Sequence, residues 1–315
     1  MLYTRRELGR LALAGVPAAG LLLKSDSGIA AGKPNSKWAG VQVGLNVPYS
    51  FGNNLMTGDE TLDRCLQLGV SAVELRSQPV EQFLGVPLNL ISARGRGTPP
   101  PDPAAQKANA EELSKWRAGA PMSKVKDFRR KWEDAGVAIE IVKFDGVYNF
   151  PDDVLDYAFN LAKNLGARAI SCEIDVPQTK RVGQFADKHR MMVGYHGHTA
   201  TGPAQWEEAF SFAKYNGANL DIGHFLSGQK TSPVPFLKQH HDRITHIHVK
   251  DKTLDDKNVP FGQGNTPIKE ALQTIRDNKW PIQATIEFEY PVPEGSDRMA
   301  EMAKSLEYCK NALLG

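Results

Sequence analysis

The chain has 315 residues, of which 41% are hydrophobic and 23% are charged, and this composition is that of an ordinary globular protein. Its 38 basic and 36 acidic residues leave a formal net charge of +2, which gives no electrostatic reason to expect nucleic acid or a membrane surface as a partner. The length suits one α/β barrel of about 250 residues with additions better than two domains. The cysteines Cys65, Cys172 and Cys309 have no zinc-ribbon spacing, and their odd number argues against a disulfide framework but leaves room for one bridge.

Residues 1–31 have the parts of an export signal. Arg5 and Arg6 precede an apolar run over residues 11–23, and small residues follow up to Ala31. The run is shorter than the roughly 20 residues that a transmembrane helix needs. The paired arginines resemble a twin-arginine signal, although a basic amphipathic first helix is an alternative. We therefore expect a bacterial periplasmic or secreted protein without a stable membrane anchor.

Strand-like and helix-like segments alternate through a single predicted domain, residues 38–315. Strands are predicted at residues 41–47, 72–76, 138–144, 169–174, 191–195, 218–222, 244–249 and 284–289. Helices are predicted at residues 60–68, 123–135, 151–165, 180–188, 203–215, 233–241, 267–278 and 297–314. This alternation indicates a parallel α/β sheet, and eight strands are the number that closes into a (βα)8 TIM barrel. An open doubly wound sheet is the alternative, but no Gly-rich dinucleotide turn joins a strand to a helix.

Residues 78–122 interrupt the alternation. Prolines cluster at residues 99–103, and Gly95 and Gly97 lie just before them, which predicts an irregular insertion. Because the insertion follows the second strand, we expect it to lie over the mouth of the barrel. There it would shape a substrate pocket or a contact in a homo-oligomer.

Ionisable side chains gather at the carboxyl ends of the last five predicted strands, where parallel barrels carry their active sites. Residues two apart share a face of a strand, so His246 and His248 point the same way, as do Glu287 and Glu289. The residues between the two glutamates and before them are apolar, so these acids are predicted to face the barrel interior. The groups at the strand ends are Glu173, His196, His198, Asp221, His224, His246, His248, Lys250, Glu287 and Glu289.

This gathering of acids and imidazoles predicts a metal site. Taken alone, each residue is more often a satisfied core histidine or half of an ion pair. Together, several carboxylates and imidazoles inside a barrel are costly to bury unless they are paired or bound to a metal. Mixed His, Asp and Glu ligands suit one divalent ion such as manganese, cobalt, zinc or magnesium.

Four segments also carry a family resemblance. They are Leu-Asp-Ile-Gly-His at 220–224, His-Ile-His-Val-Lys-Asp at 246–251, Phe-Gly-Gln-Gly at 261–264 and Ile-Glu-Phe-Glu at 286–289. In this order and spacing they resemble the motifs of the xylose isomerase-like family of sugar isomerases and epimerases. The resemblance extends over nearly the whole chain after the signal, and it implies a metal-dependent barrel enzyme that acts on a sugar or polyol.

The resemblance also implies a set of metal ligands, because one ion in that family is typically held by Glu, Asp, His and Glu. The matching positions are Asp221, His248 and Glu289. The first glutamate has no match, since the fifth strand ends Tyr-His-Gly-His at 195–198. Glu173 is the ligand we prefer for that place, and His196 is the alternative.

Such a site supports reactions that begin with an enediolate, in which a carboxylate takes up a proton next to a carbonyl group. The candidate proton-transfer residues are Glu173, Glu287 and Glu289. The candidate substrate-binding residues are His196, His198, His224, His246, Lys250 and Lys143.

The leading prediction is an isomerase or epimerase of a sugar or polyol. The alternative is a lyase or dehydratase on keto-sugars, keto-glycosides or inosose, because the Tyr-His-Gly-His strand end resembles that subset of the family. A non-catalytic carbohydrate-binding barrel is a third interpretation, and it predicts binding without metal. A DNA-repair endonuclease would need more ligands on the first two strands and a more basic face. Export makes phosphorylated sugars poor candidates.

Overall fold

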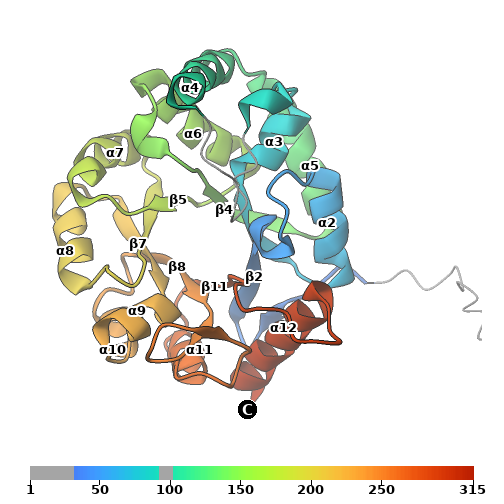
Figure 1. Cartoon of the computed structure of the whole chain (residues 1–315), viewed down its shortest axis with the longest axis vertical. Coiled ribbons are helices and arrows are strands. Elements are labelled where there is room, and N and C mark those ends of the chain that lie inside the picture. Colours follow the sequence, from blue (N-terminus) through green and yellow to red (C-terminus); the bar gives the residue numbers. More distant parts are fainter. Residues whose placement is uncertain (1–31, 92–101) are drawn as a thin grey trace, which may run out of the picture. The chain divides into compact units, whose positions relative to one another are not determined.

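Strands pair in parallel around a closed ring in the computed structural model, which describes residues 32–91 and 102–315 (Figure 1). The main sheet has nine strands, of which β1 (Lys37–Trp38) is an antiparallel addition and the other eight form the ring. The ring strands are β2 (Val41–Val47), β3 (Ala72–Arg76), β4 (Ala138–Lys143), β5 (Ala169–Glu173), β6 (Met192–His196), β7 (Asn216–Asp221), β8 (Ile244–Val249) and β11 (Gln283–Ile286). Because β2 pairs with both β3 and β11, the ring is closed, and the predicted (βα)8 TIM barrel is confirmed.

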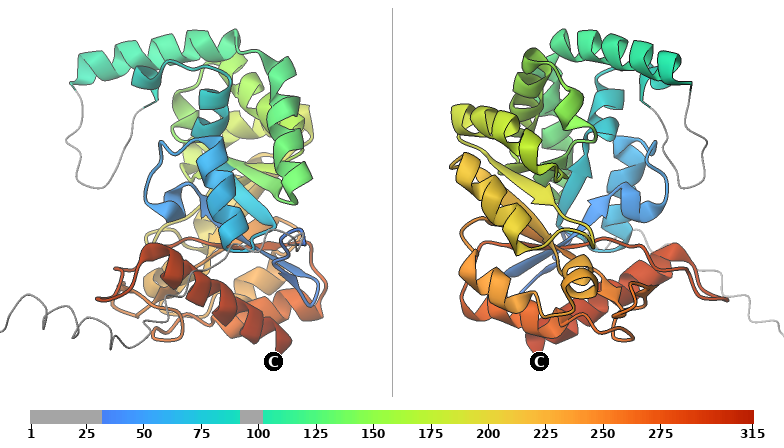
Figure 2. Two further views of the ribbon diagram at one scale, coloured as in Figure 1. Left: turned by 90° about the vertical axis from the view of Figure 1, so that its right-hand side faces the viewer. Right: turned by 60° about the vertical axis from the view of Figure 1, so that its left-hand side comes forward.

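Helices surround the strands and cover them with apolar faces. The helices predicted from the sequence are α2 (Gly58–Gln67), α5 (Val125–Ala135), α6 (Asp152–Leu165), α7 (Val176–His189), α8 (Pro203–Phe212), α10 (Val234–Gln239), α11 (Ile268–Asp277) and α12 (Arg298–Leu314). In α5, for example, Val125, Phe128 and Trp132 recur at helical spacing and are buried. Helices α11 and α12 lie side by side (Figure 2).

The interval from 78 to 122 is more regular than predicted. It contains the end of α3 (Ser77–Phe83), the 3-10 turn η3 (Leu88–Leu90) and α4 (Pro103–Ala118), so the prediction of an irregular segment is wrong for these parts. Pro103 begins α4 because a helix tolerates proline in its first turn, and Asp102 caps it by accepting a hydrogen bond from the Ala105 amide at 3.2 Å. The proline cluster therefore ends at a helix start.

Helix α4 packs beside α6 and is held to α3 by a buried ion pair. The guanidinium of Arg117 lies 2.8 Å from the Glu81 carboxylate, and the ring of Phe150 faces the same guanidinium. In Figures 1 and 2 the helix lies on the opposite side of the ring from α11. Residues 92–101 lie outside the described part of the chain, so the place of the insertion over the mouth stays a prediction.

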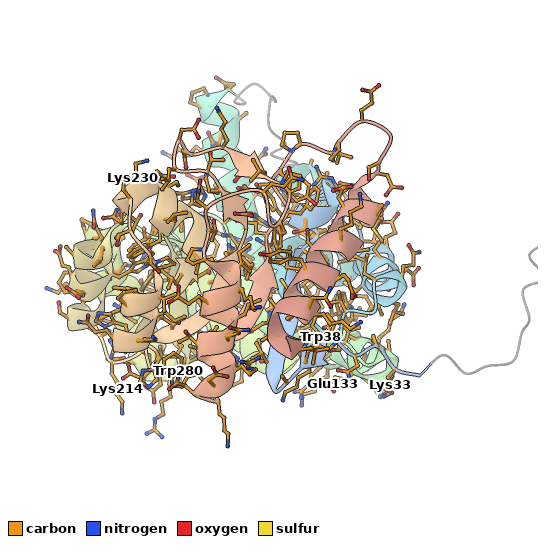
Figure 3. The ribbon with its side chains drawn as sticks, turned by 90° about the horizontal axis from the view of Figure 1, so that it is seen from below. Lys33, Trp38, Glu133, Lys214, Lys230 and Trp280 are labelled. Atoms are coloured by element: carbon orange, nitrogen blue, oxygen red, sulfur yellow. The ribbon has the colours of Figure 1, made fainter. Side chains whose placement is uncertain are left out.

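The two ends of the barrel differ in what they carry. Trp38, Glu133, Lys214 and Trp280 lie near strand starts and group at one end, whereas Lys230 lies at the other (Figure 3). Lys230 ends α9 (Ile222–Gln229), a short helix that begins directly after β7 and that the sequence did not predict. The end that carries Lys230 is therefore the mouth, where the strands have their carboxyl ends. A second unpredicted element there is the hairpin of β9 (Asp251–Lys252) and β10 (Asn258–Val259).

The predicted export signal, residues 1–31, lies outside the described residues. Among the helices that are described, none combines the length and the hydrophobicity required to cross a membrane.

Candidate active site

Four buried side chains from neighbouring strand ends meet inside the mouth. They are His196 at the end of β6, Asp221 at the end of β7, His248 in β8 and Glu287 just after β11, and we call them the four-residue centre. None is more than 4% exposed, and each offers an atom within 4.8 Å of the others. His196 Nε2 lies 3.4 Å from Asp221 Oδ2 and 3.9 Å from Glu287 Oε2. His248 Nδ1 lies 3.2 Å from the same Glu287 oxygen.

The four-residue centre fits a divalent metal ion. Ligand atoms held about 2.0 to 2.2 Å from an ion lie about 3 to 4 Å from one another, which is the spacing found here. Within the described residues, His248 Nδ1 is buried and makes no hydrogen bond of good geometry, although it lies 3.2 Å from Glu287 and buried polar atoms normally have a partner. Two imidazoles and two carboxylates suit manganese, cobalt or zinc better than calcium. These residues are therefore the ones that would hold the ion.

The centre shares only two residues with the predicted ligand set. Asp221 and His248 belong to it, whereas Glu289 pairs with Lys250 and Glu173 joins His196 and His198 in a second group that could hold a metal. The strand ends explain the difference. Glu287 and Glu289 both face inward. Glu289 comes two residues later in the chain and therefore lies nearer the rim, where its side chain is 14% exposed. His196, the alternative ligand, belongs to both groups, so the choice between Glu173 and His196 stays a prediction.

Glu173 is bonded to three basic side chains. Its Oε1 lies 2.7 Å from Lys143 Nζ, and its Oε2 lies 2.9 Å from His196 Nδ1 and 2.7 Å from His198 Nε2. Burial alone would raise the pKa of Glu173, but His196 and Lys143 outweigh it and hold the pKa far below the usual range. Glu173 therefore fixes the orientation of the His196 ring, whose Nε2 faces the centre.

Lys250 lies among the carboxylates of the mouth. Its Nζ is 3.0 Å from Asp221, 2.7 Å from Glu287 and 2.7 Å from Glu289. Burial would lower the pKa of Lys250, but the three carboxylates raise it well above the usual value. The charged ammonium thus bonds to Asp221 Oδ2 and Glu287 Oε2, which are two of the atoms that the four-residue centre offers to a metal.

The remaining predicted substrate-binding residues lie at three different depths. His198 is at the rim, with a side chain that is 61% exposed. His224 lies below it, with Nε2 at 3.3 Å from Lys250, and burial lowers its pKa to about 4. His246 is fully buried deeper in the barrel, where burial lowers its pKa to about 4, so it does not join the residues that line the mouth. Lys143 is also buried, against Glu173.

The strand end of β6 depends on a glycine. A side chain at Gly197, between His196 and His198, would overlap the ring of Trp206 and the methyl group of Thr201. The indole of Trp206 is itself fixed by a hydrogen bond of 3.0 Å to the Tyr195 carbonyl oxygen. Glycine therefore lets the β6 end pack closely on α8 and sets the positions of both histidines.

Three residues of the site were missed in the sequence. The Tyr49 hydroxyl, in the 3-10 turn η2 (Tyr49–Phe51), donates to Glu289 Oε1 at 2.6 Å. Glu74 and Arg76 point into the barrel from β3, and the Arg76 guanidinium stacks on the Tyr49 ring and binds Asp145 at 2.7 Å. The period of two in Ala-Val-Glu-Leu-Arg was a usable signal, because it puts two charged residues on one face of a buried strand.

Together, fold and centre define a (βα)8-barrel protein with a buried cluster of His, Asp and Glu at the carboxyl ends of its strands. A family model describes this class as the xylose isomerase-like TIM barrel, and it matches residues 121–312. The chain belongs to this family, as its motifs indicated.

Curated relatives match parts of the chain. An inosose dehydratase of Clostridium botulinum is 32% identical over 114 residues, which are 34% of this chain and 32% of the relative. An inosose dehydratase of Clostridium tetani is 26% identical over 133 residues, 35% of this chain and 44% of the relative. The chain thus spans about a third to under a half of the length of these relatives.

Solved structures match nearly the whole barrel at low sequence identity. A probable 3-DHS dehydratase from Bacillus anthracis superimposes with a TM-score of 0.59 at 14% identity, covering 85% of this chain and 98% of that one. An L-ribulose 3-epimerase gives a TM-score of 0.54 at 11% identity, with coverage of 87% and 95%. At these identities the likeness shows the fold, and it spans more than one reaction.

Proposed function

We propose that this protein is a metal-dependent lyase that eliminates water or a glycosidic group from an uncharged keto-sugar or keto-polyol. The observation that carries the proposal is the asymmetry of the mouth. Carboxylates lie on the β11 side, at Glu287 and Glu289, and imidazoles lie on the β6 side, at His196 and His198. Elimination next to a ketone needs a proton acceptor and a proton donor of different kinds, facing the two reacting carbons.

Glu289 has the position of the proton acceptor. It reaches the rim, and the Tyr49 hydroxyl at 2.6 Å and Lys250 at 2.7 Å hold its two oxygens in place. Burial would raise the pKa of Glu289, but Lys250 outweighs it and lowers the pKa below its usual value, so the carboxylate is ionised and ready to accept a proton. It would take the proton from the carbon beside the ketone.

His198 has the position of the proton donor across the mouth. Its Nε2 is held by Glu173 at 2.7 Å, and its exposed ring leaves Nδ1 available to a substrate. The electron pair freed at the first carbon forms the new double bond and expels the hydroxyl group of the next carbon. In its imidazolium form His198 carries a proton on Nδ1 as well as on Nε2. The leaving hydroxyl group takes the Nδ1 proton and departs as water, while Glu289 keeps the proton taken from the first carbon.

A divalent ion in the four-residue centre would act as a Lewis acid that polarises the ketone oxygen of the substrate. The centre lies between the two sides of the mouth, since β7 and β8 separate β6 from β11. His196, Asp221, His248 and Glu287 would hold the ion there, while Glu289 and His198 remain free to transfer protons.

The charges of the mouth favour an uncharged substrate. Four buried cations lie at or just after the strand ends, and each is bonded to a carboxylate within 2.8 Å. These cations are Arg76, Lys143, Lys250 and Lys252. None of these four is free to bind a phosphate or carboxylate group. The names of the curated relatives, which are inosose dehydratases, support the same class of substrate.

The test is proton NMR in D2O with a keto-inositol and a 3-keto-glycoside, using protein loaded with manganese and then freed of excess ion. We expect a product that has lost water or the aglycone. Glu289→Gln should slow its formation by about 100-fold or more, the usual contribution of a general base. Glu133→Gln, a control at the opposite end of the barrel, should react like wild type. No product and no deuterium exchange with manganese, cobalt or zinc would overturn the proposal.

The second candidate is the isomerase or epimerase that the sequence predicts first. It is favoured by two partly exposed carboxylates on different sides of the mouth, Glu173 and Glu289, which are 45% and 14% exposed. Two such groups could move a proton between the faces of one carbon. The same NMR experiment distinguishes it, because deuterium would then enter the substrate carbon without loss of water.

A further inference from the structure

A carboxylate lies directly behind the four-residue centre, on β3, a strand for which the sequence predicted no site residue. Glu74 of β3 has no exposed surface, and its Oε2 lies 2.6 Å from His248 Nε2. Its Oε1 accepts a hydrogen bond from the Ser171 hydroxyl and lies 3.3 Å from His246 Nε2. Glu74 therefore touches a residue of the centre but is out of reach of a substrate.

The contact fixes which nitrogen of His248 faces the centre. An ionised carboxylate only accepts hydrogen bonds, so the nitrogen beside Glu74, Nε2, must carry the proton. The other nitrogen, Nδ1, then presents a lone pair when the ring is neutral. This nitrogen is the buried, unpartnered atom that lies 3.2 Å from Glu287 and 4.0 Å from Asp221.

The amide of Asn219 agrees with this assignment. Its Nδ2 lies 3.0 Å from His248 Nε2, and its Oδ1 is buried without a partner. A protonated Nε2 cannot accept from the amide nitrogen. Turning the amide by 180° exchanges the two atoms and gives Nε2–H a second acceptor, and the two orientations of an amide are assigned from such contacts.

We propose that Glu74 is a positioning residue that holds the His248 imidazole with Nδ1 turned toward a divalent ion in the four-residue centre. This inference rests on the metal dependence in the proposed function, but not on which reaction follows. Metal-binding histidines usually donate their second ring nitrogen to a carboxylate or carbonyl, and that contact sets the tautomer and the ring orientation.

The surroundings of Glu74 argue against a role in stability alone. Among the described residues no lysine or arginine forms an ion pair with Glu74, so its ionisable partners are the two histidines. A buried ion pair contributes little to stability compared with apolar side chains of the same size. The site thus keeps a buried carboxylate whose contacts all lead to histidines or a hydroxyl group.

Glu173 makes the corresponding contact to His196 from the other side of the mouth, at 2.9 Å from Nδ1. Both imidazoles of the four-residue centre therefore have a carboxylate on the nitrogen that faces away from it. The two carboxylates differ in access, because Glu173 keeps 45% of its side-chain exposure and can also meet a substrate. Replacing Glu74 therefore tests an effect on metal binding alone, because Glu74 cannot contact a substrate.

The test compares the binding of manganese to the purified wild-type protein and to Glu74→Gln by isothermal titration calorimetry. We expect about 10- to 100-fold weaker binding, the usual cost of losing such a contact. Glu74→Asp, which keeps the charge on a shorter side chain, should lie between the two. Glu81→Gln is the matched control, since Glu81 is equally buried but pairs with Arg117 outside the centre. It should bind manganese like wild type even if its melting temperature falls.

The visible spectrum of bound cobalt provides a readout that a loss of stability alone would not move. Glu74→Gln should change its intensity or position, because the ligand field depends on the orientation of His248. Binding by both Glu74 variants within about threefold of wild type, with an unchanged cobalt spectrum, would overturn the proposal. A wild-type protein that binds no divalent ion would overturn it together with metal dependence. A wild-type protein that binds metal but converts no keto-sugar would refute only the reaction.

Discussion

Replacing Lys250 by methionine should make the protein depend on metal for its stability. The ammonium of Lys250 is bonded to Asp221, Glu287 and Glu289, and two of these carboxylates belong to the four-residue centre. Methionine keeps much of the length of the side chain and removes the charge. The metal-free variant is then left with buried carboxylates that have lost their shared cation, whereas a divalent ion can replace that charge.

The size of the effect follows from the burial of the group. Lys250 is 2% exposed, and it lies within 3.0 Å of all three carboxylates. Removing one partner from a buried ion pair typically costs about 3 to 5 kcal/mol, and we expect a loss of that order without metal. A divalent ion present at about 1,000 times its Kd raises the free energy of unfolding by about 4 kcal/mol, because it binds only the folded protein. The variant should also bind manganese at least about tenfold more tightly, because the ion no longer competes with the ammonium for the same oxygens.

Urea unfolding followed by circular dichroism, with EDTA and then with excess manganese, measures both effects. Lys252→Met is the matched control, because Lys252 is equally buried but pairs with Asp256 rather than with the centre. Its loss of stability should be similar with and without manganese. A Lys250→Met variant as stable as wild type in EDTA, or stabilised by manganese no more than wild type, would refute this account of Lys250.

Three further predictions concern separate parts of the molecule. Asp221→Asn should weaken manganese binding at least about 100-fold, measured by calorimetry, because it removes a charged ligand. Arg117→Met should lower the free energy of unfolding by about 3 to 5 kcal/mol in urea, because it leaves Glu81 buried without its partner, and adding Glu81→Gln should recover part of the loss. Burial would raise the pKa of Asp156, but hydrogen bonds from two basic side chains of α7 lower it below 3.8. The stability that Asp156 contributes is therefore present above pH 3.8 and lost as the pH falls below it, so Asp156→Asn should flatten the acid side of the unfolding curve.

The barrel could be predicted because its signals are local. The strands 41–47, 72–76 and 244–249 coincide with β2, β3 and β8, since in each a short segment alternates apolar and polar side chains. The alternation of faces also held where the chemistry lies. Glu287 and Glu289 both point inward, as the apolar residues between and before them indicated.

The composition of the centre could not be predicted, because it depends on depth and on pairing across the barrel. The alternation of side chains between the two faces of a strand does not distinguish Glu287 from Glu289, because both face inward and differ only in their depth in the barrel. It also does not show that Lys143 and His198 engage Glu173. These contacts join neighbouring strands, but which side chains meet depends on the stagger of the strands in the closed ring.

The insertion was misjudged for a different reason. Proline is common in loops and also in the first turn of a helix, so a proline cluster does not by itself show which of the two follows. Here Pro103, the last proline of the cluster at 99–103, begins α4. Asp102 decides between them, because it caps the helix that Pro103 begins. The buried residue of α4 is the charged Arg117 and not an apolar one, so the periodicity that revealed the other helices is weak there.

The charges at the mouth connect the metal, the substrate and the carboxylate behind the centre. Arg76 and Lys252 are each neutralised by an aspartate outside the centre, and five carboxylates then face the two remaining lysines, an excess of three negative charges when the histidines are neutral. The carboxylates are Glu74, Glu173, Asp221, Glu287 and Glu289, and the lysines are Lys143 and Lys250. Burial works against an imidazolium, yet Glu287 and Glu74 raise the pKa of His248 to about 10, which shows how strongly the site attracts positive charge. A divalent ion supplies that charge where a neutral ring can bind it, and it leaves an anionic mouth that would repel phosphorylated or acidic sugars.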